Sequence, residues 1–246
     1  MNGRQIDRGN PAQLTRHQHV HAAKCIKHFV GADGKVDVVL LGVAKTRLPP
    51  SDPLFCADRA WSLQGERALM RDNIERRFFS QLGRAVHGYS VQDHEAVSEY
   101  FFLWQMRRIA REQPIPDMKL NGITGTSLMP LQRQLAEAKH VITIDHDAKM
   151  GGQHATTIQI LRGVDERMHQ YPALRWGVAK SESGEFVVAD GYARPRFFFP
   201  VTPSIALIEG QRDCRIDHDT LRKMNRRSME QSRAYFFARD MSKCPA

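Results

Sequence analysis

Apolar side chains recur with a helical period through the middle of the chain. Residues 62–86 and 91–113 place their large apolar side chains three or four positions apart, as on one face of an amphipathic helix. Gly88 separates these two segments, and prolines follow the second. The same period predicts two further helices, over 130–139 and 153–169.

The pattern changes to short apolar runs in the last third of the chain. Residues 174–179 and 185–189 flank a Ser-Glu-Ser-Gly turn, which predicts a hairpin. Residues 197–199 and 204–209 extend this hairpin into a meander. A basic segment over 219–239 predicts a closing helix, with Asp219 as its N-cap. An earlier β-branched run over 36–43 predicts one more strand.

These elements predict an α+β fold with a helical middle, a C-terminal antiparallel β-meander and a closing helix. Residues 1–16 are polar, and we expect a flexible lead-in there. Residues 17–246 then form a single α+β domain, in which residues 62–170 are a candidate helical lobe. A chain of 246 residues is long enough to bury a sizeable core.

Charge changes this picture by suggesting partners. Lys and Arg number 36 against 27 acidic residues, a net charge of +9. Such a surface attracts nucleic acid, although acids interspersed among the bases also fit a generically basic protein. The closing helix carries candidate nucleic-acid-binding residues, with aromatic residues at 235–237 beside them for base stacking. A solvated helix face explains these basic residues equally well. They are Arg222, Lys223, Arg226 and Arg227.

Several functional classes lack their sequence signatures. There is no Walker loop, no Gly-x-Gly-x-x-Gly, no Gly-x-Ser-x-Gly and no His-Glu-x-x-His, which disfavours kinases, dinucleotide enzymes, typical α/β-hydrolases and zincins. The cofactor stays unknown, and no metal site is predicted, because the acidic loop at 145–147 lacks the EF-hand glutamate. The polar N-terminus, the lack of an apolar stretch of membrane length and the irregularly spaced cysteines predict a cytoplasmic protein without membrane contact.

The order of motifs resembles the bacterial domain-of-unknown-function family 4238, over roughly residues 17–239. The segment from His19 to Phe29 is similar to its opening signature, with Ala22 in place of a proline. The strand at 36–43, the Pro49-Pro50 loop and the helix from Glu66 to Glu75 follow in the same order. Further similar features are Gln105 with Arg108, Asp190 in the segment 186–192, the strand entry at 199–203, and Asn225 in the last helix. The resemblance implies a fold family and singles out His19; it supplies no activity.

Four residues are candidate catalytic groups: His19, Glu75, Arg108 and Asp190. Histidine titrates near neutrality and acts as a general acid or base when a carboxylate orients it. An arginine at 107 or 108 is suited to hold a phosphate. Each has a plainer explanation: a core histidine, an ion pair of Glu75 with Arg71, a helix-end arginine, and a turn aspartate.

The leading hypothesis is a protein that acts on or binds nucleic acid, as a nuclease or toxin-like effector in bacterial or phage conflict. The alternative is a non-catalytic binding or inhibitor protein that engages another protein. Convergence of the four side chains in one exposed cleft favours the enzyme, whereas their burial in separate pairs favours the binder. The sequence leaves the oligomeric state open.

Overall fold

The structure is a computed structural model that describes residues 14–192 and 197–246. Most of the predicted lead-in, residues 1–13, lies outside the described residues. Leu14 is buried, and the carbonyl of Arg16 accepts a hydrogen bond from the backbone N–H of Arg59. Residues 14–16 therefore belong to the folded part, and the predicted start of the domain at residue 17 is too late.

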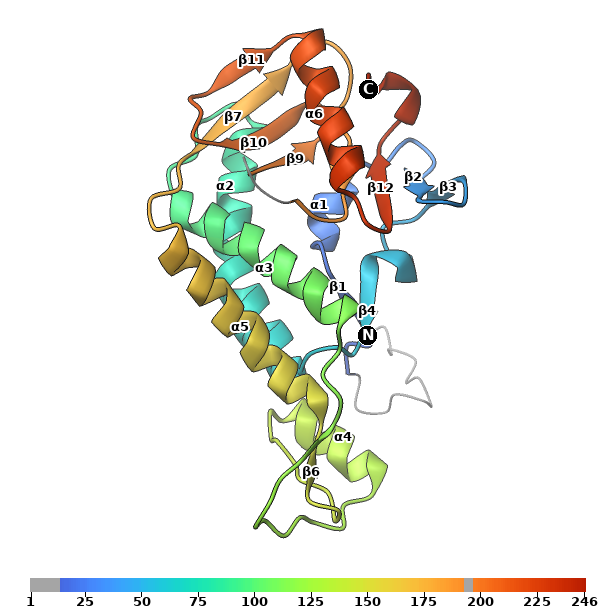
Figure 1. Cartoon of the computed structure of the whole chain (residues 1–246), viewed down its shortest axis with the longest axis vertical. Helices are drawn as coiled ribbons and strands as arrows, with labels where there is room; N and C mark the ends of the chain where they lie inside the picture. Colours follow the sequence, from blue (N-terminus) through green and yellow to red (C-terminus); the bar gives the residue numbers. More distant parts are fainter. Residues whose placement is uncertain (1–13, 193–196) are drawn as a thin grey trace, which may run out of the picture.

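Helices fill the middle of the chain, as the sequence predicts. The segment predicted as one α-helix instead begins as a π-helix, in which the backbone N–H of Arg76 still donates to the carbonyl of Arg71. α3 and α5 lie side by side, and a Cβ at Gly163 would lie 2.4 Å from Met106 (Figure 1). The elements are the π-helix η2 (Gly65–Glu75), α2 (Arg76–Val86), α3 (His94–Glu112), α4 (Pro130–Ala138) and α5 (Gly152–Gln170).

A four-stranded sheet with the order β11-β7-β10-β9 packs against α2 and α3 through Phe199 of β9. β10 (Ile205–Glu209) pairs antiparallel with both β7 (Trp176–Ser181) and β9 (Phe198–Thr202), which makes the predicted antiparallel core of the meander. β11 (Cys214–Ile216) joins β7 in parallel. The prediction of an α+β fold with a strand-rich C-terminal part and a late helix is confirmed.

The predicted hairpin between 174–179 and 185–189 is wrong. After the turn, the N–H of Phe186 donates to Pro203 and the N–H of Val187 donates to the side chain of Asn225, so the chain leaves β7. It then enters a second sheet with the order β3-β2-β12-β8. The strands of this sheet are β2 (Val36–Leu40), β3 (Lys45–Leu48), β8 (Val188–Ala189) and β12 (Tyr235–Ala238).

The closing helix is shorter than predicted. α6 (His218–Gln231) is capped by Asp217, whose side chain accepts from the N–H of Thr220, and not by Asp219. The aromatic residues expected on this helix form β12, which lies between β2 and β8 and is buried. Their burial against two neighbouring strands outweighs the helical pattern, and it removes them from the basic helix.

Shorter elements complete the chain. Residues 118–150 form a small extension, called here the hairpin lobe, beyond the N-terminal end of α5 (Figure 1). The remaining elements are β1 (His17–His19) paired with β4 (Cys56–Asp58), α1 (Ala23–Lys27), η1 (Pro53–Phe55), β5 (Met118–Lys119) paired with β6 (Lys149–Met150), and η3 (Met241–Lys243). No helix in the described ranges is long and apolar enough to span a bilayer.

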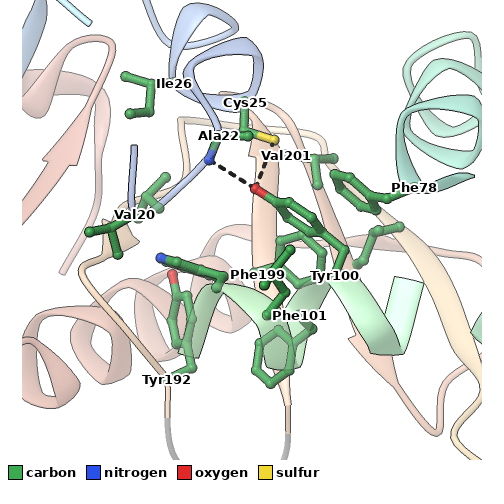
Figure 2. Packing of buried hydrophobic residues seen from close by; sticks show 14 of the residues in the cluster. Val20, Ala22, Cys25, Ile26, Phe78, Tyr100, Phe101, Tyr192, Phe199 and Val201 are labelled. Carbon is green, nitrogen blue, oxygen red and sulfur yellow. Dashed lines mark hydrogen bonds between the residues drawn. The ribbon is translucent and has the colours of Figure 1, made fainter. Parts of the chain in front are cut away.

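The main core lies between the helices and the two sheets. Tyr100 of α3 stacks on Phe78 of α2 with ring centroids 3.8 Å apart, and Phe199 of β9 packs beside both rings. Figure 2 shows the Tyr100 hydroxyl directed at the start of α1, where it bonds Ala22 N and Cys25 Sγ. A smaller cluster that includes Leu221 fills the space between α6 and the opposite face of the first sheet. Both faces of this sheet are therefore covered.

Asn225 of α6 joins this helix to two other segments, residues 185–187 and the C-terminal segment at Pro245. Its side chain accepts from the N–H of Val187 and donates to the carbonyls of Glu185 and Pro245. We expect Asn225→Ala to lower the free energy of unfolding by about 2–3 kcal/mol, because it leaves buried polar groups unpaired. Urea denaturation measures this loss. Asn121→Ala, at an exposed position, is the matched control, and equal stability of both variants would contradict the assigned contacts.

Candidate functional site

Each of the predicted catalytic residues has its own bonding partner, and only Glu75 and Arg108 pair with side chains of α3. His19 lies at the end of β1, half-buried, with its Nε2 atom 3.0 Å from the carbonyl oxygen of Pro50. That bond holds the ring against the Pro49-Pro50 loop. His19 therefore has a structural partner in a loop and is not bonded to any of the other three candidates.

Glu75 is buried and pairs with Arg107 of α3, not with Arg71. Arg71 instead pairs with its exposed neighbour Asp72. The Arg107 side chain is 1% exposed, and its second terminal nitrogen lies 3.2 Å from Glu66. Glu75 is thus one of two carboxylates that pair with the buried Arg107. A carboxylate bound in this way is not free to take a proton from a substrate.

Arg108 points away from Arg107, toward the segment that contains Asp190. It pairs with Glu112 at 3.1 Å, and a Cβ added to Gly191 would lie 2.5 Å from its Nε atom. The neighbouring Gln105 lies against the backbone of Tyr192. The absence of a side chain at residue 191 therefore lets α3 pack directly on this segment. Gln105 and Arg108, three positions apart on α3, both face it.

Asp190 holds the start of β12. Its carboxylate accepts hydrogen bonds from the backbone N–H groups of Arg233, Ala234 and Tyr235, with the shortest at 2.7 Å. The aspartate bonds a strand 43 residues away and not its own turn. The structure does not bring His19, Glu75, Arg108 and Asp190 into one exposed cleft, and the expectation that His19 bonds to a catalytic carboxylate is not met.

The π-helix explains why Glu66 and Glu75 both reach Arg107. Nine residues make about two and a half turns of an α-helix, which would place the two side chains on opposite sides. A π-helix bonds i to i+5 and has about 4.4 residues per turn, so nine residues make about two turns. Both carboxylates then face α3, and the indole N–H of Trp61 donates to Glu66 from the side.

His21, which was not among the four candidates, belongs to this cluster. Its ring lies 4.3 Å from that of Trp104, and its Nδ1 atom is bonded to the Tyr100 hydroxyl at 3.0 Å. Burial lowers the pKa of His21 to about 3, and His19 and Arg107 add to this shift. Its Nε2 atom is buried without a partner among the described residues. The alternation of His17, His19 and His21 would place all three rings on one face of an extended segment, but β1 ends at His19 and His21 alone is buried.

This cluster is sealed from solvent, which limits its chemistry. Burial raises the pKa of Cys25 to about 12 and keeps the thiol protonated, so it is not a nucleophile at neutral pH. None of the larger cavities is lined by His21, Glu75 or Arg107. Within the described residues no group of three or more His, Cys, Asp or Glu side chains is arranged to hold a metal ion. These groups lie inside the packed core.

The predicted nucleic-acid-binding residues lie on α6. Arg222, Lys223 and Arg226 are exposed, and none of them forms an ion pair with a residue in the described part of the chain. Arg227 is half-buried, with its guanidinium 5.7 Å from the centroid of the Phe198 ring. Three of the four predicted residues thus form an exposed basic strip on one side of the helix, and the fourth packs against the sheet.

Comparison with known proteins gives no match: no family model, no curated protein and no solved structure is similar to the chain. The resemblance to the domain-of-unknown-function family 4238 therefore stays a prediction.

The buried ion-pair cluster has a measurable energetic consequence. We expect Arg107→Met to lower the free energy of unfolding by about 3–5 kcal/mol, because it leaves the buried Glu75 and the half-buried Glu66 without their cation. Adding Glu66→Gln and Glu75→Gln to that variant should restore part of the loss. Urea denaturation checks both, with Arg71→Met as the exposed control, whose effect should stay within about 0.5 kcal/mol. An unchanged stability of Arg107→Met would contradict the cluster.

The lowered pKa of His21 predicts a pH dependence of stability. Between its unfolded pKa of about 6.5 and its folded pKa of about 3, the unfolded chain binds a proton that the folded chain does not. The contribution of His21 is therefore fully present above pH 6.5 and is lost as the pH falls, by at most about 1.4 kcal/mol per pH unit.

His21→Gln should consequently flatten the fall in the free energy of unfolding between pH 7 and about pH 4, relative to wild type. His146→Gln, which replaces an exposed histidine, is the control for the loss of a titrating group. Urea denaturation across this pH range measures the slopes. Parallel slopes for wild type and His21→Gln would show that the ring is not held neutral in the folded state.

Proposed function

We propose that the chain binds nucleic acid through the exposed basic strip of α6, formed by Arg222, Lys223 and Arg226. The observation that carries the proposal is that these three cations are exposed and free of ion pairs with the described residues. Cations in this state gain most from phosphate, since binding releases the counterions of the nucleic acid and breaks no existing pair. The net charge of +9 supports association with a polyanion.

The proposal stops at binding and does not extend to cleavage. A nuclease needs a general base and a charge-stabilising group within reach of one phosphate. The four predicted catalytic residues instead have four different partners. His19 bonds Pro50 and Glu75 pairs with Arg107. Arg108 pairs with Glu112, and Asp190 bonds the backbone at the start of β12. Separate interactions of this kind favour a non-catalytic role, and a toxin-like effector function in bacterial or phage conflict would need reacting groups other than these.

Binding of another protein is the second candidate, and the hairpin lobe is the observation that favours it. α4 exposes Leu131 and Leu135 one turn apart, and Val141 and Ile142 are exposed just beyond it. Apolar side chains grouped in this way on a surface are typical of protein interaction sites. Protein binding would explain the exposed apolar side chains of the hairpin lobe, whereas nucleic-acid binding would explain the exposed cations of the basic strip.

The basic strip is tested by replacing Arg222, Lys223 and Arg226 together with Gln. Fluorescence anisotropy with a labelled single-stranded oligonucleotide should show wild-type affinity falling steeply with salt. The triple variant should bind at least about tenfold more weakly, and the log–log slope against salt should shrink by about 2, because three phosphate contacts are lost.

The matched control removes the same number of positive charges elsewhere, by Arg76→Gln, Lys139→Gln and Arg162→Gln, at positions that are also exposed. Equal weakening in both triple variants would mean that only the overall charge matters. Absence of binding at low salt would remove the proposal and leave the protein partner as the better candidate. Cleavage of the oligonucleotide that is lost in His19→Ala would reinstate the enzyme.

A further inference from the structure

A cavity among the described residues lies away from α6, between the π-helix η2, the start of α3 and the end of α5. Its volume is about 870 Å³, which is within the range of sites for drug-sized ligands. The segment between α5 and β7 closes one side. Glu66, Glu75 and Arg107 do not line this cavity, although Asn73 and Ile74, which precede Glu75 on η2, do. The cavity is therefore separate from the Arg107 cluster.

Part of the cavity lining is apolar, and this part is called the floor here. Two of its side chains come from the face of η2 that does not contact Arg107, so the π-helix serves the core on one side and the cavity on the other. Ile74 and Val164 are buried, and the others are partly exposed to the cavity. The apolar lining consists chiefly of Leu69, Ile74, Leu161, Val164, Met168 and Leu174.

The rim is acidic, in contrast to the basic chain as a whole. Asp93, Glu95, Glu99 and Asp165 line it, against a single arginine, Arg175. Arg77 pairs with Asp93 and Glu99 from behind the rim, at 3.1 and 2.7 Å, and lies 3.9 Å from Glu95. The Glu95 and Asp165 side chains remain 65% and 73% exposed, and Asp165 faces only His169, at 3.5 Å.

The pKa of Glu99 is raised, chiefly by burial. Burial raises its pKa, Arg77 lowers it, and Glu95 and Asp93 raise it further. The net direction is upward even though an arginine lies in contact. A carboxylate with this balance gains from an additional cation.

We propose that this cavity binds a small amphiphilic amine, with its apolar body on the floor and its ammonium group among the rim carboxylates. The apolar floor gives affinity through burial of hydrocarbon, and the rim selects positive charge. An anionic ligand of the same shape would meet the exposed carboxylates of Glu95 and Asp165 and would bind more weakly. The site is independent of the basic strip on α6, which has the opposite charge preference.

The test uses the full chain and dansylcadaverine, a fluorescent probe with an aromatic body and a primary ammonium group. Fluorescence titration should show saturable binding, and the N-acetylated probe, which lacks the charge, should bind about tenfold more weakly. Glu95→Gln combined with Asp165→Asn should weaken dansylcadaverine binding by a similar factor. Leu161→Arg, which places a cation on the floor, should abolish it.

The matched control is Asp72→Asn with Glu166→Gln, which removes one Asp and one Glu of similar exposure that do not line the cavity. Circular dichroism melts of all variants check that the fold is kept. Equal binding of the charged and acetylated probes, or equal binding by the two double variants, would overturn the proposal. If dansylcadaverine does not bind, but a Lys- and Leu-rich peptide binds and is lost in Glu95→Gln with Asp165→Asn, the cavity is a peptide site and the proposal is wrong.

Discussion

The charge of Arg107 is the constraint around which the rest of the structure is arranged. A fully buried guanidinium is tolerated only when anions and hydrogen bonds replace the water that it has lost. Glu66 and Glu75 supply the anions, and Trp61 lies 5.3 Å from the guanidinium with its ring facing it. To bring both carboxylates to one side, the preceding helix adopts the wider π pitch. The position of η2 relative to α3 therefore follows from the charge of one side chain.

The sequence predicted elements better than it predicted partners. The apolar period located α3 and α5, and the short apolar runs located β7, β9 and β10, because these signals are local. The predicted hairpin failed because the N–H of Val187 bonds Asn225, which is 38 residues away. The helix predicted to run through 235–237 failed for the same reason, since those residues pair with β2 and β8. Such long-range bonds leave no periodic trace in the chain.

The candidate site shows the same division between local and distant information. The resemblance and the spacing drew attention to His19, Glu75, Arg108 and Asp190. Arg108 lies on α3, Glu75 pairs with α3 through Arg107, and Asp190 bonds the start of β12. Their roles were not visible, because the α-helical pitch assumed from the sequence places Glu66 and Glu75 on opposite faces. The inward-facing histidine is His21, since β1 ends at His19 and the strand alternation does not continue past it. The exposed residues of α6 were easier to predict, because exposure on an amphipathic helix follows from its period alone.

The pairing of β2 with β12 has a consequence for how the protein is made. Asp37 bonds the backbone of Met241 across 204 residues, and β12 occupies the interior of the sheet beside β2. During synthesis on the ribosome, β2 emerges early and keeps an unpaired edge until nearly all of the remaining chain has followed. Contacts of such long range slow folding, and an open strand edge recruits other strands. On the other side of β2, the outer strand β3 carries Lys45 and Arg47, both paired with Asp37, and charged side chains on an outer strand disfavour pairing with further strands.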